Sequence, residues 1–220
     1  MDPTDRTRAP DALADDPSEA FSALADARRT ILPKRLGAPG PDATGRLAIL
    51  AAAAAAPDHG RLLPWRFIEV PAALRPALAD AFERALLERD PAAGEAEAAR
   101  AREKAHRAPW LMLAVARTAG GDPAIPAHER LVSAGCAMQN VLLAATAQGF
   151  GSSLTSGKAV ASPAIRDFFG LGDDELALCF LNVGTVVEAR PPRLRPSVSD
   201  YHSVLLRPGS SRDPGGTSSR

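Results

Sequence analysis

Several residue types and patterns are scarce in this sequence of 220 residues, and each absence excludes a class of protein. It has two cysteines, Cys136 and Cys179, each within an apolar run and without metal-ligand spacing, so we expect two free thiols in a reducing compartment. The 26 basic and 26 acidic side chains cancel, which argues against binding to nucleic acid or an anionic membrane. No apolar run approaches the ~20 residues of a membrane span.

Further signals of location and chemistry are also missing. The first residues are acidic and Pro-rich, with neither the basic nor the apolar region of a signal peptide, so we expect a cytoplasmic protein. The four histidines, at positions 59, 106, 128 and 202, show no metal spacing. The sequence has no Walker motif, and its Gly149-Phe-Gly-Ser-Ser run follows a predicted helix, whereas the dinucleotide fingerprint follows a strand. Ser156 has no nucleophile-elbow pattern and no evident triad partners, so we predict no catalytic side chain.

The composition that remains, 45% hydrophobic and 24% charged, is typical of a globular protein. We expect loose tails at residues 1–16 and 207–220 and one domain over residues 17–206. Apolar periodicity predicts a first helix that opens at Pro17 and runs into Arg28-Arg29-Thr30, further helices at 42–56, 71–88, 128–148 and 163–169, and strands at 65–70, 109–116 and 176–187. By itself, this alternation of helices and strands suggests one α/β-type domain.

Two of the predicted segments have unusual surfaces. The helix at 128–148 is apolar nearly all round, which is typical of a helix in the middle of a fold or at an obligate interface. The segment from Asp90 to Arg107 is charged and Ala-rich, with little apolar face. We interpret it as a solvated excursion that can act as a mobile lid over a site.

The stretch from Ala56 to Phe67 joins an Ala/Leu helix to a strand, and it is longer than the ~2–6 residues of an ordinary connection. Two prolines and a glycine fix the turn of this stretch. The stretch places Asp58, His59 and Arg61 just before the start of the strand. Loops held between rigid elements often carry binding residues. His59 can contact a cofactor or act as a general acid, but on this residue alone a structural loop histidine bonded to nearby backbone is the simpler interpretation.

Two other clusters can bind a polar ligand. Arg28, Arg29 and Thr30 combine two guanidinium groups with a hydroxyl at a helix end, a set that suits a phosphate. On these residues alone, a solvated last turn that complements the helix dipole is the simpler interpretation. The hydroxyls that follow the 128–148 helix, at positions 152, 153, 155 and 156, can hydrogen-bond the polar edge of a ring.

Taken in order, these segments resemble the nitroreductase family of FMN-dependent oxidoreductases, and in particular its short branch of NAD(P)H nitroreductases. The resemblance covers roughly residues 20 to 190. It rests on four stretches: Arg28-Arg29-Thr30, residues 56–67, Ser133-Ala-Gly-Cys-Ala-Met-Gln-Asn140 with its continuation to Gly151, and Phe180-Leu-Asn-Val-Gly-Thr185. It implies an α+β, three-layer fold, in which a mixed, mainly antiparallel sheet is surrounded by helices. It also implies an intertwined homodimer with two FMN sites at its interface.

The resemblance assigns roles to residues of this chain. The FMN phosphate and ribityl chain would be held by Arg28, Arg29 and Thr30, and His59 would contact the flavin. The flavin ring would lie against the segment after the Gly-x-Gly turn, which comprises Leu154, Thr155 and Ser156.

Two departures concern positive charge. Relatives often carry an aromatic-basic pair at positions 154–155, and some carry an arginine at the position of Ala55. Lys158, Arg193 or Arg195 are candidates to supply that charge here.

The implied activity is a ping-pong reaction, in which hydride passes from NADH or NADPH to flavin N5 and then to a small organic acceptor such as a nitroaromatic or a quinone. Two alternatives stay open. One is a specialised biosynthetic reductase, and the other is a flavin-binding dimer without redox turnover.

Overall fold

The computed structural model describes residues 16–189, 191 and 194–205. The predicted tails at 1–16 and 207–220 therefore lie outside the described residues, apart from Asp16. The chain divides into two units, residues 1–189 and residues 190–220. The second unit contains, among its described residues, the short 3-10 helix Val198–Asp200. The first unit contains the sheet and its helices.

The sheet is organised around its longest strand. Its members are β1 (Leu36–Gly37), β2 (Trp65–Glu69), β3 (Trp110–Arg117), β4 (Gly151–Thr155) and β5 (Glu175–Val186). Strand β5 pairs with β1, β3 and β4, and β3 pairs in turn with β2. Each of these pairings is antiparallel, so the α/β class suggested by the alternation of elements is wrong. The α+β class implied by the resemblance is confirmed.

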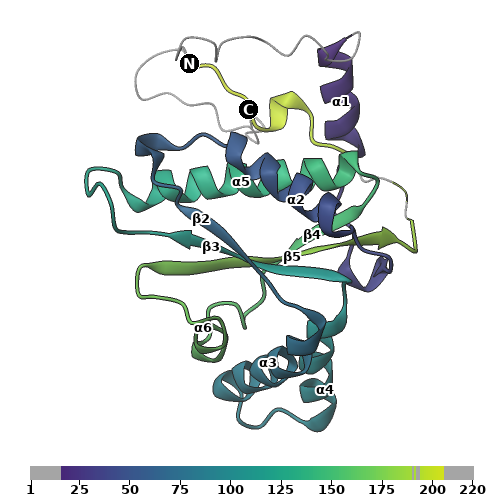
Figure 1. The fold of residues 1–220 in the computed structure, drawn as a ribbon, viewed down its shortest axis with the longest axis vertical. Helices are drawn as coiled ribbons and strands as arrows, with labels where there is room; N and C mark the ends of the chain where they lie inside the picture. Colours follow the sequence, from purple (N-terminus) through teal and green to yellow (C-terminus); the bar gives the residue numbers. More distant parts are fainter. Residues whose placement is uncertain (1–15, 190, 192–193, 206–220) are drawn as a thin grey trace, which may run out of the picture. The chain divides into compact units, whose positions relative to one another are not determined.

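The described residues form six α-helices. They are α1 (Pro17–Ala27), α2 (Ala43–Ala51), α3 (Arg75–Arg89), α4 (Glu95–Glu103), α5 (Ala127–Ala147) and α6 (Pro163–Phe169). Helices α2 and α5 lie over one face of the sheet, and α3 and α6 lie over the other (Figure 1). Among the described residues, no helix combines the length and apolar character that crossing a membrane requires.

Local capping explains why several predicted helix ends are confirmed. The Asp42 carboxylate accepts a hydrogen bond of 2.7 Å from the Gly45 N–H at the start of α2. Ser162 does the same for Ile165 at the start of α6. Gly149 follows the end of α5 with φ of 81°, the left-handed conformation that the residue after a helix often adopts.

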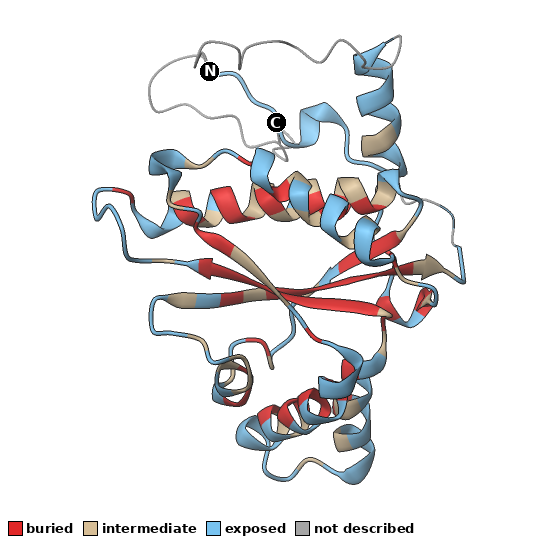
Figure 2. Cartoon of the chain, viewed as in Figure 1, coloured by how far each residue is buried: buried red, intermediate tan, exposed pale blue. Residues whose placement is uncertain are grey.

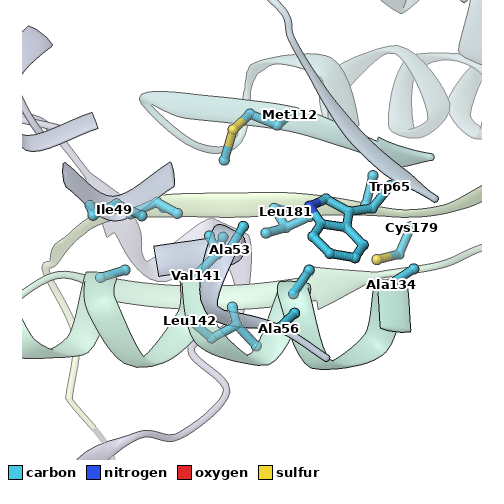
Figure 3. Packing of buried hydrophobic residues seen from close by; sticks show 14 of the residues in the cluster. Ile49, Ala53, Ala56, Trp65, Met112, Ala134, Val141, Leu142, Cys179 and Leu181 are labelled. Atoms are coloured by element: carbon cyan, nitrogen blue, oxygen red, sulfur yellow. The ribbon is translucent and has the colours of Figure 1, made fainter. Parts of the chain in front are cut away.

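The core has two parts because both faces of the sheet are covered by helices, and buried residues follow the strands and the inward faces of α3 and α5 (Figure 2). On the α5 side, Trp65 packs among Leu181, Cys179 and Ala134 (Figure 3). Trp65, the first residue of β2, is thus part of the core. Cys179 is a buried free thiol whose pKa burial raises to about 11, so it behaves as a small apolar side chain.

The segment from Asp90 to Arg107 differs from its prediction as a solvated excursion. It forms α4 and the 3-10 helix η5 (Lys104–His106), which pack against α3. Ala101 and Ala105 are buried in the core beneath α3, while the charged residues of α4 face outward. The few alanines of this segment are a sufficient apolar face because α3 approaches them closely.

Two strands were missed by periodicity. β1 has two residues, too few for a pattern. β4 begins Gly-Ser-Ser, residue types with weak strand preference, and it becomes a strand because its backbone pairs with residues 180–184 of β5. The missed strand β4 is the one that carries the predicted ring-binding residues.

Candidate functional site

A cavity of about 450 Å³ opens beside the end of β4, on the α3 side of the sheet. This volume is within the range of small-molecule sites. It contains all three residues predicted to lie against a flavin ring. Its lining is formed by Leu32, Pro33, Phe82, Lys104, Arg107, Leu111, Leu154, Thr155, Ser156, Gly157, Ala159, Val160, Phe180 and Asn182.

The back wall of the cavity is apolar and continuous with the core. Phe82 of α3, Leu111 of β3 and Phe180 of β5 are buried members of the core on this side of the sheet, and the Phe82 and Phe180 ring centroids lie 5.3 Å apart. The polar edge is formed by Thr155, Ser156 and Asn182. An apolar face beside a polar edge is suited to a flat heteroaromatic ring.

The charged side of the cavity comes from η5 and the residue after it. Lys104 and Arg107 line the cavity, and its described lining contains no carboxylate. Desolvation, followed by the charges of Arg107 and Arg89, lowers the pKa of Lys104 from its usual value. Among the described residues, none forms an ion pair with Lys104. Arg107 donates from Nη2 to Glu103 Oε2 at 2.6 Å, so its charge is partly compensated.

A buried arginine fixes the backbone of η5. Arg75, 7% exposed, donates from Nη1 to the Ala105 carbonyl at 2.6 Å and from Nε to the Val70 carbonyl at 3.0 Å. Arg75 thus links two segments: the turn that contains Lys104, and the residue that follows β2. Its desolvation lowers the pKa of the guanidinium, partly offset by Glu69. Two carbonyls therefore compensate a cation that water does not reach.

The predicted phosphate-binding residues lie next to β4. Thr30 forms an isolated parallel bridge with Ser152, and the Ile31 N–H donates to the Ser152 carbonyl at 2.9 Å. Leu32 and Pro33, which follow closely after Thr30 in the chain, line the cavity. Arg28, Arg29 and Thr30 are themselves outside the lining. The fold brings this segment beside the predicted ring-binding strand.

The connection between η2 (Ala52–Ala55) and β2 is tightly constrained. The Asp58 carboxylate accepts hydrogen bonds from the N–H groups of Leu62, at 3.0 Å, and Leu63, at 2.8 Å. Arg61 and Leu63 have positive φ values of 53° and 46°, which few non-glycine residues adopt. At Gly60, with φ of 71°, a Cβ would come within 2.4 Å of Ile125. The loop is therefore held in one strained shape.

His59 lies in this loop, on the 3-10 helix η3 (His59–Arg61). Its Nδ1 is 2.7 Å from Glu129 Oε2 in the first turn of α5, and its side chain is 69% exposed. His59 is not part of the cavity lining of its own chain. The predicted contact between His59 and the flavin stays a prediction. Within one chain, His59 does not share the cavity that residues 154–156 line.

Lys104 and Arg107 are the cations of the cavity lining, and neither is among the predicted candidates Lys158, Arg193 and Arg195, whose role stays a prediction. Lys158 is outside the lining, Arg193 lies outside the described residues, and Arg195 belongs to the second unit. Lys104 and Arg107 were missed because their segment was interpreted as solvated. Asn182 was missed as well, although a single amide in the apolar run of β5 was a usable signal.

Comparison with known sequences identifies relatives over most of the chain. Residues 26–185 match the model of the Nitroreductase family. A Haemophilus influenzae protein named "Putative NAD(P)H nitroreductase" is 37% identical over 155 residues, which are 70% of this chain and 83% of that protein. The Escherichia coli "Putative NAD(P)H nitroreductase YdjA" is 34% identical over 167 residues, 75% of this chain and 85% of that protein.

Solved structures share the fold at lower identity. A nitroreductase-like protein from Bacillus cereus superposes with a TM-score of 0.71 at 18% identity, covering 85% of this chain and 96% of that chain. A variant of NfnB, an FMN- and NADPH-dependent nitroreductase from a Sphingopyxis strain, superposes with a TM-score of 0.67 at 18% identity, covering 84% of this chain and 99% of that chain. At such identities the likeness concerns the fold alone.

The Arg75 clamp predicts a local loss of stability when it is removed. Arg75→Met leaves the Val70 and Ala105 carbonyls without a donor, so we expect the free energy of unfolding to fall by about 1–3 kcal/mol. Urea unfolding, followed by circular dichroism, measures this loss. The substitution should also increase the rate of amide hydrogen exchange most in residues 104–107. Arg84→Met, an exposed change on the same helix, is the matched control. Equal effects of the two variants would contradict the clamp.

Proposed function

Because the chain belongs to the nitroreductase family, a family of flavin oxidoreductases, we propose that it is an FMN-dependent enzyme that takes hydride from NADH or NADPH and reduces a small organic acceptor. The observation that carries this proposal is the cavity at the end of β4. It joins an apolar wall, a hydroxyl and amide edge, and a lysine that has no counterion among the described residues.

The residues of the cavity fit the ring of FMN and favour a negative charge beside it. Phe82, Leu111 and Phe180 give an apolar surface for the ring faces, and Thr155 and Ser156 give hydrogen-bonding groups for a ring edge. Lys104 and Arg107 favour an anionic group. Gly157 adds a place without a side chain, where a Cβ would meet no atom within 4 Å. Arg28, Arg29 and Thr30, next to β4, are proposed to hold the phosphate.

Bound FMN would supply the redox chemistry, by accepting hydride at N5 and passing two electrons to the acceptor in a ping-pong cycle. The protein's own groups bind, orient and stabilise charge. Lys104 raises the positive potential where negative charge gathers in the reduced state, and the apolar wall excludes water from the ring face. Acceptors consistent with such a cavity are nitroaromatics and quinones.

The proposal includes a homodimer, supported by apolar side chains on the α2/α5 layer. Val132 of α5 is 64% exposed and Leu47 of α2 is 71% exposed. A Cβ added to Gly135 on α5 would meet no atom within 4 Å, so a second backbone can approach there. A homodimer through this layer would also give His59 a route to the flavin of the other subunit, since His59 lies outside the cavity of its own chain.

The first prediction is spectroscopic. The purified 220-residue chain, titrated with FMN, should bind it and shift its visible absorption, and anaerobic NADH or NADPH should then bleach that absorption. Adding a nitroaromatic or a quinone should restore it. Protein that binds no FMN contradicts the proposal. Flavin that binds but is not bleached by either nucleotide would favour a binding dimer without turnover, and bleaching without reoxidation by the panel would favour a specialised reductase.

The second prediction concerns Lys104. Lys104→Met should raise the Kd for reduced FMN about tenfold, because the reduced ring carries a negative charge and the variant loses the cation that stabilises it. In the wild type, affinity should fall as the pH rises through the lowered pKa of Lys104, since the charged form binds the anion. The variant should lack this component of the pH profile. Lys158→Met is the matched control, and fluorescence titration across pH measures both. A control that loses as much affinity as Lys104→Met would refute the assignment.

The third prediction concerns the dimer. Val132→Glu places a charge on the exposed apolar layer and should shift the protein towards the monomer in size-exclusion chromatography with light scattering. FMN affinity should fall with it if the site spans two subunits. Leu87→Glu, on α3 at the other face of the sheet, is the control and should stay dimeric. A wild-type protein that is monomeric at micromolar concentration would overturn this part of the proposal.

A further inference from the structure

Asn182 is an amide among the apolar residues in the middle of β5, and it lines the cavity. It is 2% exposed and pairs in register with Leu111 of β3 and Ser153 of β4. Burying an amide costs free energy unless its hydrogen bonds are made. The bonds that Asn182 makes therefore indicate what it does in this site.

The direction of these bonds can be assigned from the chemistry of the neighbours. Nδ2 of Asn182 lies 3.4 Å from the Phe180 carbonyl oxygen and 3.5 Å from the Ser153 carbonyl oxygen. Carbonyl oxygens only accept hydrogen bonds, so the atom that faces both of them must be the amide nitrogen and not the oxygen. The orientation of the side-chain amide is thereby fixed.

The shortest bond of the same nitrogen goes to a side chain of the cavity. Nδ2 lies 3.0 Å from Thr155 Oγ1, closer than either carbonyl. Since the nitrogen donates, the Thr155 hydroxyl accepts. A hydroxyl has one hydrogen, and among the described residues no group accepts it. Because Thr155 lines the cavity, that hydrogen is left for whatever occupies it.

We propose that Asn182 is a positioning residue that fixes the Thr155 hydroxyl as a hydrogen-bond donor towards the bound ligand. The atom that the ligand places there is an acceptor, a carbonyl oxygen or an unprotonated ring nitrogen, and not an N–H group. Thr155 thus recognises the ring edge as a neutral donor, while Lys104 and Arg107 provide the charge. This inference rests on the proposed function, with the flavin ring as the ligand that supplies the acceptor atom.

A double-mutant cycle separates this role from simple packing. Asn182→Leu keeps the approximate volume but removes the donor, and Thr155→Val removes the hydroxyl. Each should raise the Kd for FMN about threefold to tenfold, the loss expected for one neutral hydrogen bond. The double variant should bind no more weakly than Thr155→Val alone, because Asn182 acts through the hydroxyl. Thr155→Ser, which keeps the hydroxyl, should bind like the wild type.

The measurements are fluorescence titration with FMN and thermal unfolding of each variant without FMN. Equal losses from Asn182→Leu in the wild-type and Thr155→Val backgrounds would overturn the inference and make Asn182 a packing residue. If Asn182→Leu does not fold, Thr155→Ser and Thr155→Val still decide, since equal affinities for FMN would refute the donor. Wild-type protein that binds FMN while the cycle fails refutes this inference alone, whereas wild-type protein without FMN binding refutes the proposed function and the inference together.

Discussion

The burial of β5 on both faces is the constraint on which the rest of the molecule depends. This strand runs from Glu175 to Val186 and pairs with β1, β3 and β4, so its backbone groups order most of the sheet. Its side chains alternate between two cores, with Leu181 and Val183 towards α5 and Phe180 towards α3. A strand enclosed in this way has no solvent face, which is why its sequence is apolar almost throughout.

The cavity arises where this arrangement meets a backbone turn from a distant part of the chain. β4 pairs with β5 and ends at the cavity, and η5 reaches the same place because α4 packs on α3. Arg75 fixes that approach by donating to the Ala105 and Val70 carbonyls. The sheet therefore supports the polar edge of the cavity, and the helix layer supports its two cations, Lys104 and Arg107. Each part rests on a buried element, as a preorganised site requires.

The polar groups of the site divide the work of recognition between charge and direction. Lys104 acts as a point charge at longer range and does not specify which atom it faces. The pair of Asn182 and Thr155 is directional, because an amide nitrogen held by two carbonyls leaves the hydroxyl only one available role. In the proposed site the two tasks therefore lie on different elements, with charge on η5 and direction on β4 and β5.

Local signals determined a large share of the fold. Asp42 and Ser162 set helix starts, Gly149 follows the end of α5, and the apolar runs of β3 and β5 gave buried strands, because caps and periodicity act within a few residues. The ordered motifs around Arg28, His59 and Phe180 were enough to indicate the family. They also placed Leu154, Thr155 and Ser156 together, and these residues do line one cavity.

Only the tertiary structure decided the remainder. Gly151-Ser-Ser has weak strand preference and becomes β4 through pairing with β5. From the sequence, Lys104 and Arg107 were interpreted as solvated charges. In the structure, packing on α3 and the hydrogen bonds of Arg75 place the turn that carries them beside the cavity. His59 is predicted to contact the flavin, and the structure adds that its Nδ1 lies 2.7 Å from Glu129 Oε2 of the same chain. In each case the deciding contact joins residues far apart in sequence, and such contacts leave no local pattern to detect.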